Sequence, residues 1–266
     1  MNVLRPVLNP TDIWQQIRSE AQELAQVEPS LASFYHASIL NHATLVDTVS
    51  YHIANLLDSQ ALPAISLREV FFEAMAGDQQ IEVSLCRDIE AYCARDPACN
   101  QYLMPLLYFK GFQSLVAYRV AHWLWGQGRK CLALYLQNRI SQAFGVDIHP
   151  AAVIGSGIMI DHATGVVIGE TTVVGDDVSM LHAVTLGGSG NAKGNRHPKI
   201  GKGVLIAAGA KILGDISIGE GAKIGAGSVV LNSVPPHSTA VGVPAKIVGR
   251  PASDNPAQDM NHEFDQ

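Results

Sequence analysis

The spacing of large aliphatic residues changes abruptly near residue 146 of the chain. Before that point, apolar residues recur at the spacing of amphipathic helices, as Ile13, Ile17 and Leu24 do. Beyond it, one aliphatic residue recurs every six positions. Neither an α-helix nor an ordinary β-strand has this period. The pattern therefore predicts two parts with different architectures.

Residues 1–146 are predicted to form a helical N-terminal domain of six to eight helices. Ser66 and Glu69 have the spacing of a capping box ahead of an apolar run. An apolar-rich stretch from Tyr102 to Phe144 follows later in the same domain. We expect these segments to pack as a bundle.

The six-residue period extends through residues 147–250 and predicts a coil of short strands. Six residues fit one strand and one turn, with one aliphatic side chain pointing inward on each flat face. Three such faces close a triangular coil of about 18 residues, as in other β-solenoids. The thirteen aliphatic starts are Ile148, Ile154, Ile160, Ile168, Val174, Met180, Leu186, Ile200, Ile206, Ile212, Ile218, Ile224 and Val230.

The fold class predicted is therefore an N-terminal α-helical domain followed by a C-terminal left-handed parallel β-helix. A β-sandwich, the alternative, would show alternation and irregular spacing. Glycine follows many of the aliphatic starts, and we expect it there because tight corners favour a positive φ. These glycines are Gly155, Gly169, Gly175, Gly201, Gly219 and Gly225.

The register of this repeat breaks twice. A two-residue slip lies between Ile160 and Ile168, and an eight-residue excess lies between Leu186 and Ile200. A solenoid needs no insertions to be stable, and loops that project from repeats commonly carry function. Both breaks contain a histidine, so they are the first places to look for a site.

Composition excludes several classes of protein. The 266 residues are 47% hydrophobic, which is enough for a sizeable core. The formal charge is −6 and no basic run reaches five residues, so a nucleic-acid partner is not expected. No apolar stretch approaches the ~18 residues of a membrane span. The first residues lack a signal peptide pattern, and we expect a cytoplasmic protein without a membrane partner.

The four cysteines all lie in the first half of the chain and form no CxxC pair. Two disulfides are the alternative, but reduced thiols are the interpretation that suits a cytoplasmic chain of this length. The cysteines are Cys86, Cys93, Cys99 and Cys131.

Four segments resemble one known family, the serine O-acetyltransferases of the hexapeptide-repeat acyltransferase superfamily. They read VDIHPAAVIGSGIMIDHATGVVIGE, TLGGSGNAKGNRHPKIG, GVPAKIVG and, upstream, ARDPAC. The resemblance extends from roughly residue 10 to residue 250. It implies transfer of acetyl from acetyl-CoA to the hydroxyl of L-serine, which gives O-acetyl-L-serine and CoA, the first step of cysteine biosynthesis from serine.

His162, within DHATG, is the predicted general base. The serine hydroxyl is a weak nucleophile at neutral pH, and a neutral imidazole has a pKa suited to removing its proton. A histidine that merely caps a turn is the alternative. The resemblance implies that Asp147, fifteen residues earlier, orients this ring. The spacing alone does not prove contact, and an exposed aspartate at the domain junction is the alternative.

A zwitterionic substrate needs groups of both charges. Arg196 could hold the serine carboxylate in a bidentate pair, whereas Asp96 and Asp161 could hold the ammonium. The family pattern supports these roles and adds His197 and Glu170, the latter in direct contact or as support. A solvated arginine and a helix-ending aspartate are the alternatives for Arg196 and Asp96.

Acetyl-CoA is expected to lie along the coil, in a groove between two neighbouring chains. Backbone groups near Gly188, Ala208 and Ala226 could contact the pantetheine, and Lys223 and Lys246 could contact phosphates. A backbone N–H near Gly188 could stabilise the oxyanion. The resemblance implies direct transfer without an acyl-enzyme, and no metal is required.

The family also implies partners. Trimers that pair into a hexamer are expected, and L-cysteine is expected to inhibit because it is serine with sulfur in place of oxygen. Binding of cysteine synthase, the O-acetylserine sulfhydrylase, uses a tail ending in isoleucine in many members. Residues 251–266, predicted to be a flexible tail, end in Gln266 instead, so this contact is truncated, lost or altered.

Three other functions stay open at this point. One is a related acetyltransferase acting on a sugar or an antibiotic. A second is a zinc enzyme of the γ-type carbonic anhydrase class, which needs three histidines, two of them closely spaced. No two of the coil histidines are five residues apart; they are His149, His162, His182, His197 and His237. The third is an inactive scaffold.

Overall fold

A computed structural model describes residues 9–190 and 194–263. The chain divides into two compact units, Met1–Tyr108 and Phe109–Gln266. The change from helices to strands falls where the spacing of apolar residues changes, because α8 ends at Phe144 and β1 begins at Val146. None of the helices in the described ranges is both long and apolar enough to span a membrane.

In the first unit, the described residues form helices joined by loops, without a strand. Its elements are α1 (Pro10–Val27), a 3₁₀ turn (Pro29–Leu31), α2 (Ala32–Tyr35), a π-helical turn (His36–Leu40), α3 (Leu45–Leu56), α4 (Ala64–Gly77), α5 (Gln80–Arg95) and α6 (Leu103–Tyr108). Helix α1 buries Ile13 and Ile17, as its spacing predicts. Thr44 and Asp47 form a capping box at the start of α3.

The capping box predicted at Ser66 and Glu69 is wrong. Both residues lie inside α4, which begins at Ala64 with Pro63 as its N-cap residue. The backbone N–H of Ala64 donates to Asp58 Oδ1 at 2.7 Å. A carboxylate from the preceding loop thus satisfies a donor at the helix N-terminus.

The second unit begins with α7 (Lys110–Gly126) and α8 (Lys130–Phe144), which bring the described α-helices before the coil to eight, within the predicted range. The Tyr118 hydroxyl and the Arg119 guanidinium of α7 donate to coil carbonyls, those of Ala152 at 2.5 Å and Gly155 at 2.8 Å. Gly145 caps the C-terminus of α8, and its φ of 68° is the left-handed conformation that glycine favours.

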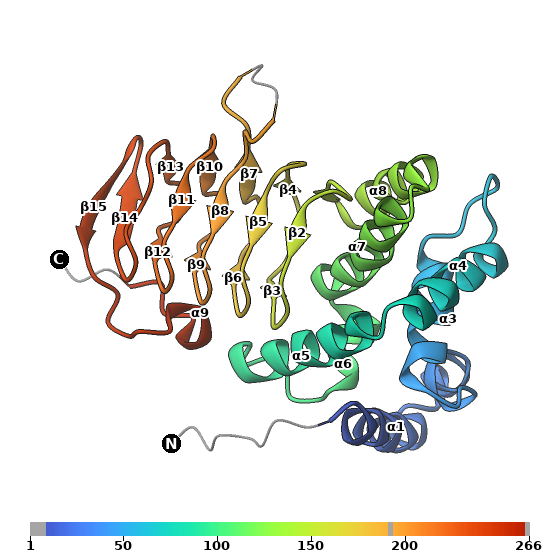
Figure 1. The fold of residues 1–266 in the computed structure, drawn as a ribbon. Helices are drawn as coiled ribbons and strands as arrows, with labels where there is room; N and C mark the ends of the chain where they lie inside the picture. The colour runs from blue at the N-terminus through green and yellow to red at the C-terminus, as the bar shows by residue number, and fades with distance from the viewer. Residues whose placement is uncertain (1–8, 191–193, 264–266) are drawn as a thin grey trace. The chain divides into compact units, whose positions relative to one another are not determined.

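Fifteen short strands follow in the part of the chain that the structure describes, and most of them form the walls of the coil (Figure 1). They are β1 (Val146–Ile148), β2 (Val153–Ile154), β3 (Met159–Ile160), β4 (Val166–Ile168), β5 (Val173–Val174), β6 (Ser179–Met180), β7 (Thr185–Gly187), β8 (Lys199–Ile200), β9 (Leu205–Ile206), β10 (Lys211–Leu213), β11 (Ser217–Ile218), β12 (Lys223–Ile224), β13 (Val229–Val230), β14 (Thr239–Gly242) and β15 (Ala245–Gly249).

Successive strands enter three different sheets in turn, which defines a three-sided parallel solenoid. The orders are β1-β4-β7-β10-β13 in sheet 1, β2-β5-β8-β11 in sheet 2 and β3-β6-β9-β12-β14-β15 in sheet 3. Only β15 pairs antiparallel among the described strands, with β14. The predicted parallel β-helix is confirmed. All thirteen aliphatic starts are buried.

The pairing register reproduces both breaks. Ile212 pairs with Val230, the third aliphatic start after it, which is one uninterrupted coil. Ile148 pairs with Ile168 across the first break, and Val174 pairs with Ile200 across the second. Each of these partners is again the third start along the chain. The extra residues therefore loop out while the inward positions stay aligned.

The expectation for the glycines after the aliphatic starts is wrong. Residues with positive φ include Gly203 and Gly221, which lie at a different position of the repeat. At Gly175 and Gly201, a Cβ atom would lie 2.9 Å and 2.6 Å from backbone nitrogens of the next coil. Glycine is needed there because adjacent coils approach too closely for any side chain.

Residues after β15 return to the coil. Helix α9 (Pro256–Asp259) buries Pro256 and Ala257, and the Ser179 hydroxyl donates to Ala257 O at 2.7 Å. Part of the segment predicted to be a flexible tail therefore has defined contacts with sheet 3. Its last residues, including Gln266, lie outside the described residues.

Candidate active site

The first register break forms the turn that carries His162. The turn joins β3 to β4, and both His162 and Ala163 have positive φ, 57° and 56°. Among the described residues they are the only adjacent pair of non-glycine residues in this conformation. Such a conformation costs energy and is enriched at functional sites. The side chain of His162 is 74% exposed, and its Nε2 lies 3.6 Å from Asp161 Oδ2.

His162 begins a column of residues along one edge of the coil, where sheet 3 passes into sheet 1. Its ring contacts the His182 ring edge-on, with centroids 5.9 Å apart. The column continues through Ala208 and Ala226, because Gly209 N donates to His182 O and Gly227 N donates to Ala208 O. We call this row the His162 edge. It places the predicted base in line with two predicted acetyl-CoA contacts.

The second register break forms a separate edge, where sheet 1 passes into sheet 2. The chain leaves the coil there, after β7 ends at Gly187 and before β8 begins at Lys199 (Figure 1). Arg196 Nη2 donates to Glu170 Oε2 at 2.5 Å, and this bond lowers the pKa of Glu170. We call the row Glu170, Gly188, Arg196 and His197 the Arg196 edge.

Thr171 holds the Arg196–His197 segment in place. Its hydroxyl oxygen accepts from the backbone N–H groups of Arg196 and His197, at 3.1 Å and 3.2 Å. His197 Nδ1 in turn accepts from Thr171 N at 3.1 Å. Burial, assisted by the Arg196 charge, lowers the pKa of His197. The ring is therefore neutral at neutral pH and can accept a hydrogen bond from Thr171.

Two glycines make room for this arrangement. A Cβ atom at Gly169 would lie 2.1 Å from both Cδ2 and Nε2 of His197. A Cβ atom at Gly188 would lie 3.3 Å from Arg196 O. The position of the His197 ring thus depends on the absence of a side chain at Gly169.

Asp147 lies on β1, half-buried, and its Oδ1 accepts from Gln137 Nε2 of α8 at 2.7 Å. In the described parts of the single chain, no hydrogen bond joins Asp147 to His162, so the dyad stays a prediction. The carboxylate of Asp147 instead interacts electrostatically with the ring of His149. Burial lowers the pKa of His149, while Glu170 and Asp147 oppose that shift and Arg196 adds to it.

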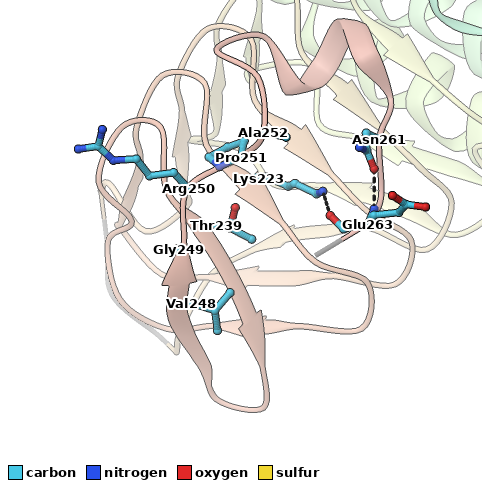
Figure 2. A pocket seen from close by; sticks show the side chains of 9 residues that line it. All are labelled: Lys223, Thr239, Val248, Gly249, Arg250, Pro251, Ala252, Asn261 and Glu263. Carbon is cyan, nitrogen blue, oxygen red and sulfur yellow. Dashed lines mark hydrogen bonds between the residues drawn. The ribbon is translucent and has the colours of Figure 1, made fainter. Parts of the chain in front are cut away.

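Lys223 lies beside a pocket of about 170 Å³ formed by β12, β14, β15 and the returning C-terminal segment (Figure 2). Its ammonium donates to Glu263 O, and Asn261 Oδ1 accepts from Glu263 N. Burial and the Lys223 charge lower the pKa of His262, while Asp161 raises it. His262 therefore lies within electrostatic range of both charges. Lys246 is exposed on β15.

Asp96 belongs to the first unit, where it ends α5. Its N–H donates to Tyr92 O at 2.9 Å, and its Oδ1 accepts from Ala98 N at 2.8 Å. The neighbouring Pro97 and Ala98 are exposed, and Asp96 itself is partly exposed. The carboxylate therefore lies at the surface of its unit.

The structure groups most of the predicted residues of the second unit into two edges and places Asp147, Lys223 and Lys246 outside both. Sheet 1 separates them, since the four residue-to-residue steps from Gly165 to Gly169 span roughly 13 Å along β4. Sequence reasoning missed Thr171, Gln137 and His149 as supporting residues. Thr171 could have been suspected from its hydroxyl directly after Glu170, but its partners lie in the next coil, on the far side of the insertion.

Two sequence profiles match the chain. One, described as serine acetyltransferase, N-terminal, matches residues 13–117, and the other, described as bacterial transferase hexapeptide (six repeats), matches residues 197–232. Together they cover parts of both the helical region and the coil, so this is an acyltransferase of the hexapeptide class.

Curated proteins and solved structures identify the family within this class. The serine acetyltransferase of Salmonella typhimurium is 59% identical over 252 residues, 95% of this chain and 92% of the relative. A crystal structure of serine acetyltransferase from Vibrio cholerae has a TM-score of 0.95 at 60% identity, covering 96% of this chain and 99% of the other. The chain belongs to the serine acetyltransferase family, which sets aside the zinc enzyme and the sugar or antibiotic acetyltransferase.

Relatives have also been solved with ligands. A serine acetyltransferase in complex with cysteine has a TM-score of 0.94 at 56% identity, covering 96% of this chain and all of the other. Further complexes contain coenzyme A, in the Brucella abortus protein, and serine, in the Neisseria gonorrhoeae protein, at 50% and 53% identity.

Proposed function

We propose that this protein transfers acetyl from acetyl-CoA to the hydroxyl of L-serine and releases O-acetyl-L-serine and CoA, the first step of cysteine biosynthesis. The observation that carries the proposal is the His162 edge. A base on a strained turn, in line with Ala208 and Ala226, suits a long thioester lying along the coil with its acetyl group near the imidazole. Family membership and the complexes of relatives with coenzyme A and serine support the same reaction.

His162 acts as the general base in this proposal. Its Nε2 accepts the serine hydroxyl proton as the oxygen attacks the thioester carbonyl, and this contributes roughly 10²–10⁴ in rate. Asp161, 3.6 Å from Nε2, stabilises the imidazolium that forms. The C–S bond of the tetrahedral intermediate then breaks, and the imidazolium returns the proton to the departing CoA sulfur. Asp147 is the proposed orienting partner, and its bond to Gln137 holds its carboxylate in a fixed position.

The Arg196 edge is the proposed amino-acid site. The Arg196 guanidinium binds the serine carboxylate, Glu170 aims the guanidinium, and neutral His197 adds a hydrogen bond. Asp161 and Asp96 are the proposed partners of the ammonium. The Arg196–Glu170 bond and the Thr171 anchor support this assignment because they pre-organise the cation.

Acetyl-CoA is the proposed occupant of the groove beside the His162 edge. Gly188 would supply an N–H to the oxyanion and, with Ala208 and Ala226, backbone contacts to the pantetheine. Lys223 and Lys246 would contact phosphates. The buried position of Lys223 at the pocket in Figure 2 favours an anion partner for it once Glu263 is displaced.

A second copy of the chain completes the proposed site. One serine molecule cannot contact both edges of one coil when roughly 13 Å of strand lies between them. The His162 edge of one protomer facing the Arg196 edge of the next would bring the base and the guanidinium together. A closed ring of three such contacts is a trimer, and we propose that two trimers pair into a hexamer.

The remaining proposals follow from the family. L-cysteine, found in a complex with a relative, would bind in place of serine and inhibit. We further propose that the protein works in the cytoplasm. Residues 1–146 would serve in oligomerisation and in part of the serine site, residues 147–250 in acyl transfer, and residues 251–266 as the tail.

The test is a panel of acceptors with acetyl-CoA, following release of the CoA thiol. The proposal predicts thiol release with L-serine, inhibition by L-cysteine, and stoichiometric O-acetyl-L-serine by mass spectrometry. Thiol release with a sugar acceptor but not with L-serine would overturn it.

A further inference from the structure

Two cysteine thiols flank Asp96 in the first unit. Cys93 lies in the last turn of α5 and Cys99 lies just beyond the exposed turn that Pro97 and Ala98 form. The two Sγ atoms are 3.6 Å apart, and each lies 3.7 Å from the same acceptor, Gln101 O. Neither thiol has a role in the proposed reaction.

We propose that Cys93 and Cys99 form a reversible disulfide, and that this bond weakens amino-acid binding by displacing Asp96. The first part stands on the geometry of the two thiols alone. The second part rests on the proposed function, which makes Asp96 a partner of the serine ammonium.

The geometry favours this pair. A disulfide needs an S–S separation near 2.05 Å, so the sulfurs must approach by only about 1.5 Å. Helix α5 ends at Arg95, so Cys99 lies outside the helix that carries Cys93. Cys93 is partly exposed, whereas Cys99 is 4% exposed. An oxidant therefore reaches Cys93 first, and Cys99 lies in position to resolve the product.

The other two cysteines provide a contrast. Cys86 is buried, and burial, together with neighbouring carboxylates, raises its pKa to about 12, so it stays a protonated, unreactive thiol at neutral pH. Cys131 is exposed on α8, in the second unit. Exposure alone therefore does not make a cysteine a candidate for a disulfide. The contact between the thiols of Cys93 and Cys99 does.

A peroxide is the oxidant class that we propose. The Cys93 thiolate attacks one peroxide oxygen, the O–O bond breaks, and the departing hydroxide leaves as water after it takes up a proton. The Cys99 thiolate then attacks the sulfur of the Cys93 sulfenic acid, the S–O bond breaks and a second water leaves. Two thiols lose two electrons in total and hydrogen peroxide gains them. A dithiol reductant reverses the bond by thiol–disulfide exchange.

The bond acts directly on the Asp96 loop. Asp96 O accepts from Cys99 N at 3.0 Å, and Asp96 Oδ1 accepts from Ala98 N at 2.8 Å. Pulling Cys99 toward Cys93 moves both of these donors and therefore the carboxylate. Loss of one charge-assisted bond to the substrate ammonium corresponds to a rise of about tenfold or more in the serine KM.

The experiment treats the full-length protein with hydrogen peroxide and maps the peptides without reduction. We expect a linked peptide pair containing Cys93 and Cys99, a mass loss of about 2 Da for the two hydrogens, and a rise in the serine KM that dithiothreitol reverses. Cys93→Ser and Cys99→Ser should abolish the link and the KM change. The matched control Cys131→Ser should retain both.

Each other outcome overturns part of the proposal. A peptide map without the Cys93–Cys99 link refutes the disulfide. A link that leaves the serine KM unchanged, or a peroxide effect that persists in Cys93→Ser, refutes the effect on Asp96. If the reduced protein does not acetylate serine at all, the proposed function and the Asp96 effect both fail. The peptide map still decides the disulfide itself in that case.

Discussion

Adding a single methyl group at Gly169 tests whether coil packing sets the position of the His197 ring. The new Cβ atom of Gly169→Ala would lie 2.1 Å from Cδ2 and Nε2 of His197. Non-bonded carbon atoms rest about 3.5–4.0 Å apart, so the ring must retreat by at least about 1.4 Å. A movement of that size breaks the contact between His197 Nδ1 and Thr171 Oγ1, now 2.9 Å.

Two consequences follow from that displacement. Overpacking against the buried His197 ring costs about 1–3 kcal/mol of stability. A misplacement near 1 Å in a substrate-positioning group can lower the rate about 100-fold. We therefore expect kcat/KM for serine to fall by about 10- to 100-fold in Gly169→Ala, with little change in the KM for acetyl-CoA.

The assay is steady-state thiol release with each substrate varied, together with denaturant unfolding. Gly126→Ala is the matched control, since nothing lies within 4 Å of its added Cβ. Gly155→Ala controls for coil strain elsewhere, because its Cβ would meet Asp176 Oδ1 at 2.6 Å. In a His197→Ala background the stability cost of Gly169→Ala should disappear. A Gly169→Ala protein with native stability and serine kinetics would refute the reasoning.

Three further predictions address the charges. Arg196→Ala should raise the serine KM by about 10- to 100-fold through loss of a charge-assisted contact, and far more than the acetyl-CoA KM; equal effects in steady-state kinetics would indicate a structural arginine. Lys223→Ala should raise the acetyl-CoA KM by about tenfold and leave the serine KM unchanged, and the reverse pattern would contradict a phosphate contact. Burial lowers the pKa of His52 to about 4, so the unfolded state binds a proton that the native state excludes as pH falls from 6.5 toward 4. The free energy of unfolding should therefore drop by about 3 kcal/mol between pH 6.5 and pH 4. In urea titrations at these two pH values, His52→Leu should lack this drop. An identical pH dependence of the wild type and the variant would contradict the prediction.

The coil could be predicted from the sequence because its physics is local. One inward aliphatic residue in every six marks both a strand and the face of the coil to which it belongs. All thirteen aliphatic starts could therefore be assigned from the sequence, and all are buried in the structure. The two breaks were located for the same reason, since extra residues interrupt a strict count. The histidines that they carry, His162 and His197, lie on the two edges described above.

The rest depends on contacts between coils, which a linear count does not contain. The clash at Gly169 involves His197, and the Thr171 anchor reaches across the same insertion. The role of Gly201 likewise comes from the backbone of Glu220 in the next coil rather than from its own φ. The helical unit shows the same limit, because Asp58 from a loop supplies the acceptor that Ser66 was expected to provide.

The central claim is that the imidazole of His162 removes the serine proton, and His162→Ala tests it most directly. The side chain is 74% exposed in the single chain, so its removal should leave the unfolding transition unchanged. We predict that kcat for CoA release with L-serine falls by at least about 100-fold. A folded His162→Ala protein that keeps a tenth or more of the wild-type kcat would contradict the account.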